Sequence, residues 1–198
     1  MLFGVNDRRT FILNERLTNE RKNMDAQVLQ AFDVYMSDPS AATYDLLRQS
    51  FINSPGYSPY DSNLEDVYAF LDEGKLASAL NNLMAMMPNW FLNPNVHVLA
   101  GFLHRKLGNE DAAQMETALA HLMLAGILST GDGSRERPYK VTHTDDEYDV
   151  IESFGKKPDS QALIKHDGRS FDNLICEDGT TFWFEVTDLL ARLDQKTS

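Results

Sequence analysis

Two short segments of this 198-residue chain combine residue types that can do chemistry. The first, Gly131-Asp132-Gly133-Ser134, has the small residues of a phosphate-binding loop. Phosphate loops, however, precede a helix and direct its positive N-terminus at the anion. This segment follows a helical pattern, where the helix dipole is negative. We therefore interpret Gly131 as a helix terminator and Asp132 as the residue that caps the turn.

The second segment is the acidic group Asp145, Asp146, Glu147 and Asp149. Such carboxylates can bind calcium or a basic peptide, but a calcium loop spreads its oxygen ligands over an irregular backbone. Here the four carboxylates open a predicted helix and point in different directions around it. Residues 144–147 also match a capping box, in which a hydroxyl and a carboxylate bond the free amides of the first turn. We interpret the group as a helix start.

The sequence contains no motif that indicates a metal site or a catalytic nucleophile. The five histidines contain no His-Glu-x-x-His pattern. The single cysteine, Cys176, can form neither an internal disulfide nor a thiolate metal site. No Gly-x-Ser-x-Gly elbow and no Walker motif is present. We therefore assign no catalytic residue, no metal and no cofactor, and we lean toward a protein that is not an enzyme.

Aromatic residues beside proline are the best candidates for recognition. Two of them, Tyr57 and Tyr60, flank Pro59, and aromatic side chains held in this way lose little entropy on binding. The alternative is a rigid connector whose tyrosines pack on the neighbouring helices. Trp90 follows Pro88 and can anchor a partner or the C-terminal half in the same way.

Six amphipathic helices are predicted in residues 23–130. The fourth is expected to end before Pro88, which leaves Trp90 in a loop. Gly74 and Gly108 lie 34 residues apart, and 34 residues is the length of a tetratricopeptide unit. Because the aromatic positions do not repeat, an unrelated antiparallel bundle is the alternative. We predict tetratricopeptide-like antiparallel helical hairpins.

Residues 131–198 have the pattern of a small α+β region. Asp167-Gly168 and Asp178-Gly179 are tight-turn signals that join three predicted strands into an antiparallel meander. A short strand at Tyr139, a short helix near residues 145–154 and a last helix from Thr187 complete the region. The expected fold class is α+β, with helical hairpins packed on a small antiparallel sheet.

Composition narrows the list of partners. The net charge of −12 repels nucleic acid and anionic lipid, so neither is expected to bind. The basic arm at residues 1–22 lacks the apolar core of a secretory signal, so we expect a cytoplasmic protein. Within that arm, residues 10–13 can add a strand to a sheet edge, in this chain or in a second copy, and the second case would give a homodimer.

Several pieces of the chain occur in an order that resembles an uncharacterised family of bacterial domains of unknown function. The pieces are residues 54–60, Thr130-Gly131-Asp132-Gly133, Tyr139-Lys140-Val141, Glu147-Tyr148 and Gly155. The resemblance covers about residues 40–186. It implies a helical front followed by a small sheet, and it implies no activity.

Three functions follow as hypotheses. The leading one is a non-enzymatic module that binds an unknown protein or peptide through its helical half. The second is an enzyme of unrecognised type, with a cleft between the halves lined by Asp132, Tyr139 and Tyr148. The third is an acidic, immunity-like inhibitor of a basic partner.

Overall fold

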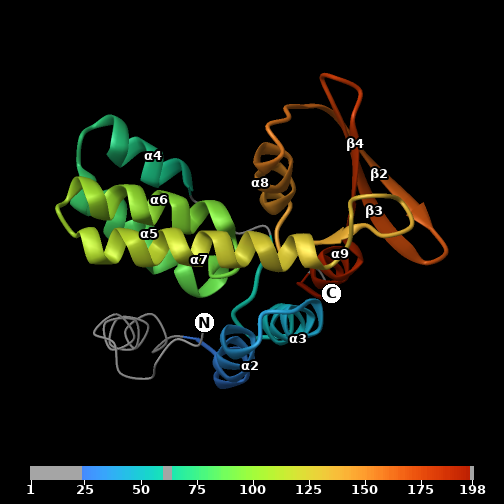
Figure 1. Ribbon diagram of the computed structural model, residues 1–198, viewed down its shortest axis with the longest axis horizontal. Coiled ribbons are helices and arrows are strands. Elements are labelled where there is room, and N and C mark those ends of the chain that lie inside the picture. Colours follow the sequence, from blue (N-terminus) through green and yellow to red (C-terminus); the bar gives the residue numbers. More distant parts are fainter. Residues whose placement is uncertain (1–23, 60–63, 197–198) are drawn as a thin grey trace.

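The structure, a computed structural model, describes residues 24–59 and 64–196. The N-terminal arm and Tyr60, both singled out above, lie outside the described residues. Eight described helices and four strands form an α+β fold, as predicted (Figure 1). In chain order the elements are α2 (Ala26–Ser37), α3 (Ala41–Ile52), α4 (Leu64–Asp72), α5 (Leu76–Trp90), α6 (Pro94–Lys106), α7 (Glu110–Ser129), β1 (Tyr139–Lys140), α8 (Asp145–Ser153), β2 (Pro158–His166), β3 (Arg169–Cys176), β4 (Thr181–Glu185) and α9 (Thr187–Lys196).

The helices pack as consecutive hairpins. Helix α4 turns back into α5 at Gly74, and α6 turns back into α7 at Gly108. The φ angles of these two glycines are 70° and 80°, in the left-handed region that only glycine adopts without strain. The 34-residue spacing therefore separates two equivalent turns. A third hairpin, α2 with α3, lies beneath the end of α7 (Figure 1).

The expected helix end before Pro88 is wrong. Helix α5 continues through this proline to Trp90. A proline inside a helix removes one hydrogen bond and strains the preceding turn. Here Met87 and Trp90, on the two sides of the proline, are both buried in the cluster formed by α4, α5 and α6. Their burial offsets the cost of the proline, and Trp90 consequently belongs to a helix and not to a loop.

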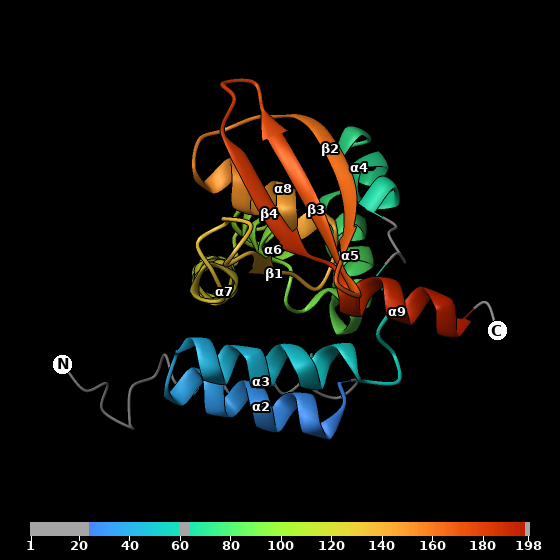
Figure 2. The same cartoon turned by 90° about the vertical axis from the view of Figure 1, so that its right-hand side faces the viewer.

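The sheet has the strand order β1-β4-β3-β2. Strands β2, β3 and β4 form the predicted antiparallel meander, and the turn residues Asp167 and Gly168 have φ angles of 49° and 74°. The sheet is mixed and not purely antiparallel, because β1 pairs in parallel with β4. The chain leaves β1, forms α8 and the β2–β3 hairpin, and then returns to the same edge. Figure 2 shows α8 behind the sheet, whose other face is open.

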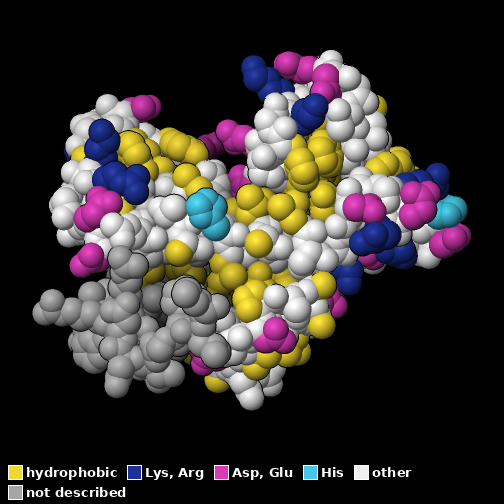
Figure 3. Space-filling model, in the orientation of Figure 1, with side chains coloured by type: hydrophobic (Ala, Val, Ile, Leu, Met, Phe, Trp, Pro, Cys, Tyr) yellow, Lys and Arg dark blue, Asp and Glu magenta, His cyan; other side chains and the backbone are white. Residues whose placement is uncertain are grey.

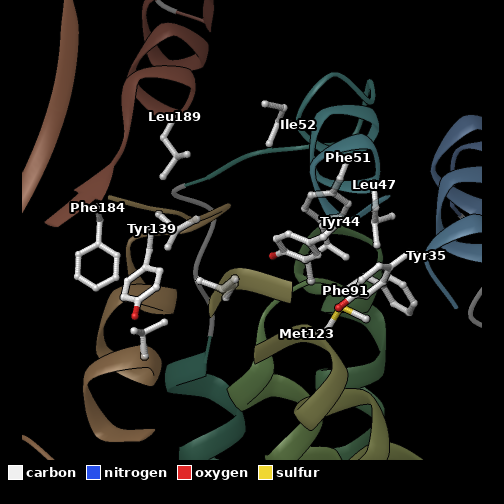
Figure 4. Packing of buried hydrophobic residues seen from close by; sticks show 14 of the residues in the cluster. Tyr35, Tyr44, Leu47, Phe51, Ile52, Phe91, Met123, Tyr139, Phe184 and Leu189 are labelled. Atoms are coloured by element: carbon white, nitrogen blue, oxygen red, sulfur yellow. The ribbon is translucent and has the colours of Figure 1, made fainter. Parts of the chain in front are cut away.

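The main apolar core joins the helices to the sheet. It contains Tyr44 and Phe51 from α3, Met123 from α7, Tyr139 from β1 and Phe184 from β4 (Figure 4). A second cluster lies between α4, α5 and α6. No helix among the described residues is both long and apolar enough to cross a bilayer. The domain boundaries proposed at residues 22 and 130 stay predictions.

Candidate functional site

Helix α8 begins with carboxylates that do not form the predicted capping box. The side chain of Thr144 makes no capping hydrogen bond. Asp146 instead turns back along the chain, where its Oδ2 atom accepts hydrogen bonds from the backbone N–H groups of Thr142 and His143, at 2.8 and 2.9 Å. The Thr142 hydroxyl donates to the same atom. Asp146 therefore fastens the connector before α8.

A further acid of α8, Asp149, is bound to groups at the start of α6. Asp149 accepts from the Asn93 side chain at 3.1 Å and from the Asn95 backbone N–H at 3.3 Å. Burial, followed by the charge of Asp146, raises the pKa of Asp149 to about 7. Asn93 also donates to Asp146 at 2.8 Å. These contacts join the start of α6 to α8, so Asp146 and Asp149 have a structural role.

Glu147 lies on the opposite side of α8, against the sheet. Its carboxyl is fully buried and is hydrogen-bonded to the carboxyl of Asp172 on β3. Burial is the main reason that the pKa of Glu147 rises to about 10, and the charge of Asp172 is the next. Burial also raises the pKa of Asp172. Two carboxyls this close share a proton, because they cannot both ionise at low cost.

Gln161 on β2 connects this carboxyl pair to the surface. Its Nε2 donates to Asp172 Oδ2 at 2.9 Å and to Glu147 Oε2 at 3.2 Å. Its Oε1 accepts from the Tyr148 hydroxyl at 2.9 Å. Beside it is a cavity of about 190 Å³, lined by Tyr148, Pro158, Asp159, Ser160, Gln161 and Leu174. The carboxyl pair lies directly behind the wall of this cavity.

The acids of α8 and Asp172 on β3 have no ion-pair partner in the described part of the chain. Among the described residues, no lysine, arginine or histidine forms an ion pair with Asp145, Asp146, Glu147, Asp149 or Asp172. In the same part of the chain, no group of three or more histidine, cysteine or acidic side chains is arranged to hold a metal. Acidic side chains also lie in the notch between the helical stack and α8 (Figure 3). The site is therefore an acidic one.

Comparison with known proteins shows the family to which this chain is related. A family model described as a domain of unknown function, DUF4919, matches residues 43–194. The chain belongs to the DUF4919 family. No curated protein and no solved structure matches it. The match runs from α3 to α9 and confirms the resemblance to an uncharacterised domain family, and the site lies within it. Kinship with tetratricopeptide repeats stays a prediction.

The aromatic residues expected at the surface of this DUF4919 protein are buried. Tyr57 is 4% exposed and donates its hydroxyl to the backbone oxygen of Thr142. Pro59 is buried beside it. Trp90 is 2% exposed and stacks on the His143 ring, with 4.2 Å between ring centroids. In this conformation Tyr57 and Pro59 belong to the rigid connector that was the alternative for their segment. Trp90 packs on the C-terminal half, the second of the two roles expected for it, through the ring of His143.

Asp132, Tyr139 and Tyr148 do not line one cavity. Asp132 is exposed and accepts from the Ser134 backbone N–H at 3.0 Å, the turn-capping role expected for it. Tyr139 is buried against Phe184. Of these three, Tyr148 alone lines the cavity beside β2. Sequence reasoning missed Gln161 and Asp172, although an aspartate that alternates with Leu174 and Cys176 on the inner face of a strand was a detectable signal.

Proposed function

We propose that this DUF4919 protein is a non-enzymatic interaction module that binds an extended segment of a partner protein at the free edge of β2. The observation that carries the proposal is the exposure of this strand. All nine residues of β2 except the half-buried Ile164 are exposed. On one side β2 pairs with β3, and the described residues provide no strand on its other side.

The backbone of β2 offers hydrogen bonds to such a segment. His166 and Arg169 flank a two-residue turn and are paired. Hydrogen-bonded pairs then recur at every second residue of the ladder. This alternation leaves Gln161, Leu163 and Lys165 with N–H and C=O groups that point away from β3. An extended peptide can bond these groups and add a strand to the sheet.

The usual protections of an edge strand are weak here. Natural proteins blunt free edges with proline, charge, bulges or short strands. In β2 the proline and the bulge both lie at the start, at Pro158 and before Ser160. The following residues to His166 pair in unbroken register with β3, and Lys165 is the only lysine among them. A regular, exposed edge of this length favours a partner strand.

The cavity favours recognition of a side chain over catalysis on a whole substrate. Its volume of about 190 Å³ is below the roughly 300–1,000 Å³ of ordinary small-molecule sites. Its place beside the outward-facing edge of β2 suits one side chain of a bound strand. The enzyme hypothesis retains only Tyr148 of its three residues in this cavity.

Selection from a displayed library of random nine-residue peptides, with the full chain immobilised, tests the proposal. We expect wild type and Leu163→Thr to enrich peptides, and Leu163→Pro to lose that enrichment. Proline removes the outward N–H while leaving the bonds to β3, whereas threonine keeps the N–H and changes only an exposed side chain. Thermal melts establish that all three variants fold. Equal enrichment by the proline variant would refute edge binding.

A further inference from the structure

The cavity beside β2 presents hydrogen-bond acceptors to whatever enters it. Gln161 donates through Nε2 to Asp172 and Glu147, on the side away from solvent. Tyr148 donates its hydroxyl to Gln161. The donors of both lining side chains are therefore already used in hydrogen bonds within the protein. The atoms left to face the cavity include the lone pairs of the tyrosine and amide oxygens and the carboxylate of Asp159.

Four acidic residues lie in, beside or behind the wall of the cavity, and Lys157 precedes the lining residue Pro158 in the chain. Asp159 lies in its wall, Asp145 is exposed at the start of α8, and Glu147 and Asp172 lie behind Gln161. None of the described cations forms an ion pair with these four acids. In addition, Oε1 of Glu147 is fully buried and receives no hydrogen bond from any described N–H or O–H group.

Buried carboxyls without a cation cost folding free energy. A pair that shares one proton keeps one negative charge, and this charge behind the cavity wall favours a cationic ligand in the cavity. The cavity holds the equivalent of about six water molecules, enough for a guanidinium or ammonium group but little more.

We propose that this cavity binds the cationic head of a lysine or arginine side chain carried by the partner strand on β2. This inference rests on the proposed edge binding and specifies which side chain the bound strand carries. The cation contacts Asp159, the Gln161 carbonyl oxygen and the ring of Tyr148, an aromatic face that attracts cations. The carboxyl pair behind Gln161 supplies negative potential. The bound segment is thus extended, with one basic residue at a fixed position.

The same peptide selection tests this inference through the sequences that it enriches. With wild type, we expect lysine or arginine at one peptide position to exceed its library frequency about tenfold, since hydrogen bonds between charged groups contribute this much affinity. With the double variant Asp159→Asn/Asp172→Asn, which removes the carboxylate in the cavity wall and the one behind Gln161, we expect peptides to be enriched without that basic position. Asp167→Asn, a change at the exposed hairpin tip, is the matched control and should retain it.

A synthetic peptide provides the second measurement. The most enriched sequence is made with its basic residue and again with norleucine, which keeps the aliphatic stem without the charge. Wild type should bind the basic peptide about tenfold more tightly, and the double variant less than twofold.

The outcomes separate the two proposals. Enrichment without any basic position would overturn the cation site and leave edge binding intact. A basic preference that persists in the double variant would also overturn it, since the preference would then reflect only the overall charge of the chain. No enrichment at all would refute edge binding itself. Formation of a dimer by the protein alone, lost in Leu163→Pro, would assign the edge to a second copy and overturn the basic partner.

Discussion

Replacing Glu147 by glutamine should remove one contribution to the pH dependence of the free energy of unfolding. Glu147 is fully buried and faces Asp172, which belongs to β3. The charges of Asp146 and Asp145, on the same helix as Glu147, also raise its pKa. Its pKa rises from 4.5 to about 10 on folding. A carboxyl whose pKa is raised by folding contributes stability that is complete below the unfolded value. That stability is lost as the pH climbs from 4.5 toward 10.

The magnitude follows from the pH interval. Above pH 4.5 the unfolded chain releases the proton while the folded chain keeps it, which costs about 1.36 kcal/mol per pH unit. Between pH 5.5 and pH 8 the loss is on the order of 3 kcal/mol. Glutamine has nearly the same shape and does not titrate. The variant should therefore gain about 3 kcal/mol relative to wild type over this interval.

Urea unfolding of both proteins, repeated in half-unit steps from pH 5.5 to pH 8, measures this difference. The range stays above the isoelectric point of 4.7, where the chain would precipitate. Comparison with wild type cancels the titrating groups that do not contact Glu147, whereas Asp172, which shares its proton, titrates differently in the variant. Glu152→Gln changes an exposed carboxylate on the same helix and should show no trend. A difference between wild type and Glu147→Gln that stays constant within about 0.5 kcal/mol would mean that Glu147 is ionised, and the reasoning would fail.

Three further substitutions test the packing that holds the site. Gly126→Ala should cost roughly 1–2 kcal/mol in urea unfolding, because its Cβ would lie 2.2 Å from the buried ring of Tyr44 and the gain in helix propensity offsets only part of the clash. Glu116→Leu should cost about 3 kcal/mol or more on the same scale, since it leaves His97 buried without the partner that lies 2.8 Å from its Nδ1; no loss would refute the pair. Tyr57→Phe should lower stability by about 1 kcal/mol and leave peptide enrichment unchanged, whereas lost enrichment at full stability would return this tyrosine to a binding role.

Local patterns predicted the elements of this fold well where one residue type decides the backbone. The glycines at 74 and 108 end α4 and α6, because a left-handed residue is needed there. Asp167-Gly168 likewise forms the predicted hairpin turn. Pro88 was misread because the burial of its helical neighbours, a tertiary effect, outweighs its local preference. The parallel pairing of β1 was missed for a related reason, as the direction of a strand depends on the path of the chain between partners.

The candidate site was the least predictable part because its members come from separate elements. Glu147 and Asp149 are two residues apart on α8, yet one turns to the sheet and the other to α6. The capping interpretation treated them as equivalent, because a capping box describes only the first turn of a helix. What distinguishes them is the strand register, which aligns Gln161 with Leu174 and brings Asp172 beneath α8. No local pattern contains that register.

The acidic residues around α8 fall into two sets with different surroundings. Asp146 and Asp149 are satisfied by N–H donors and a hydroxyl from the connector, Asn93 and the start of α6, so their negative charge is used within the fold. The side-chain amide of Gln161 donates to both Glu147 and Asp172, and the two carboxyls also bond each other. When the two carboxyls share one proton, one negative charge remains behind the cavity wall, where the proposed cation would lie. Under the proposed cation site, the edge of β2, rather than the helical hairpins, is the surface on which a partner should be sought.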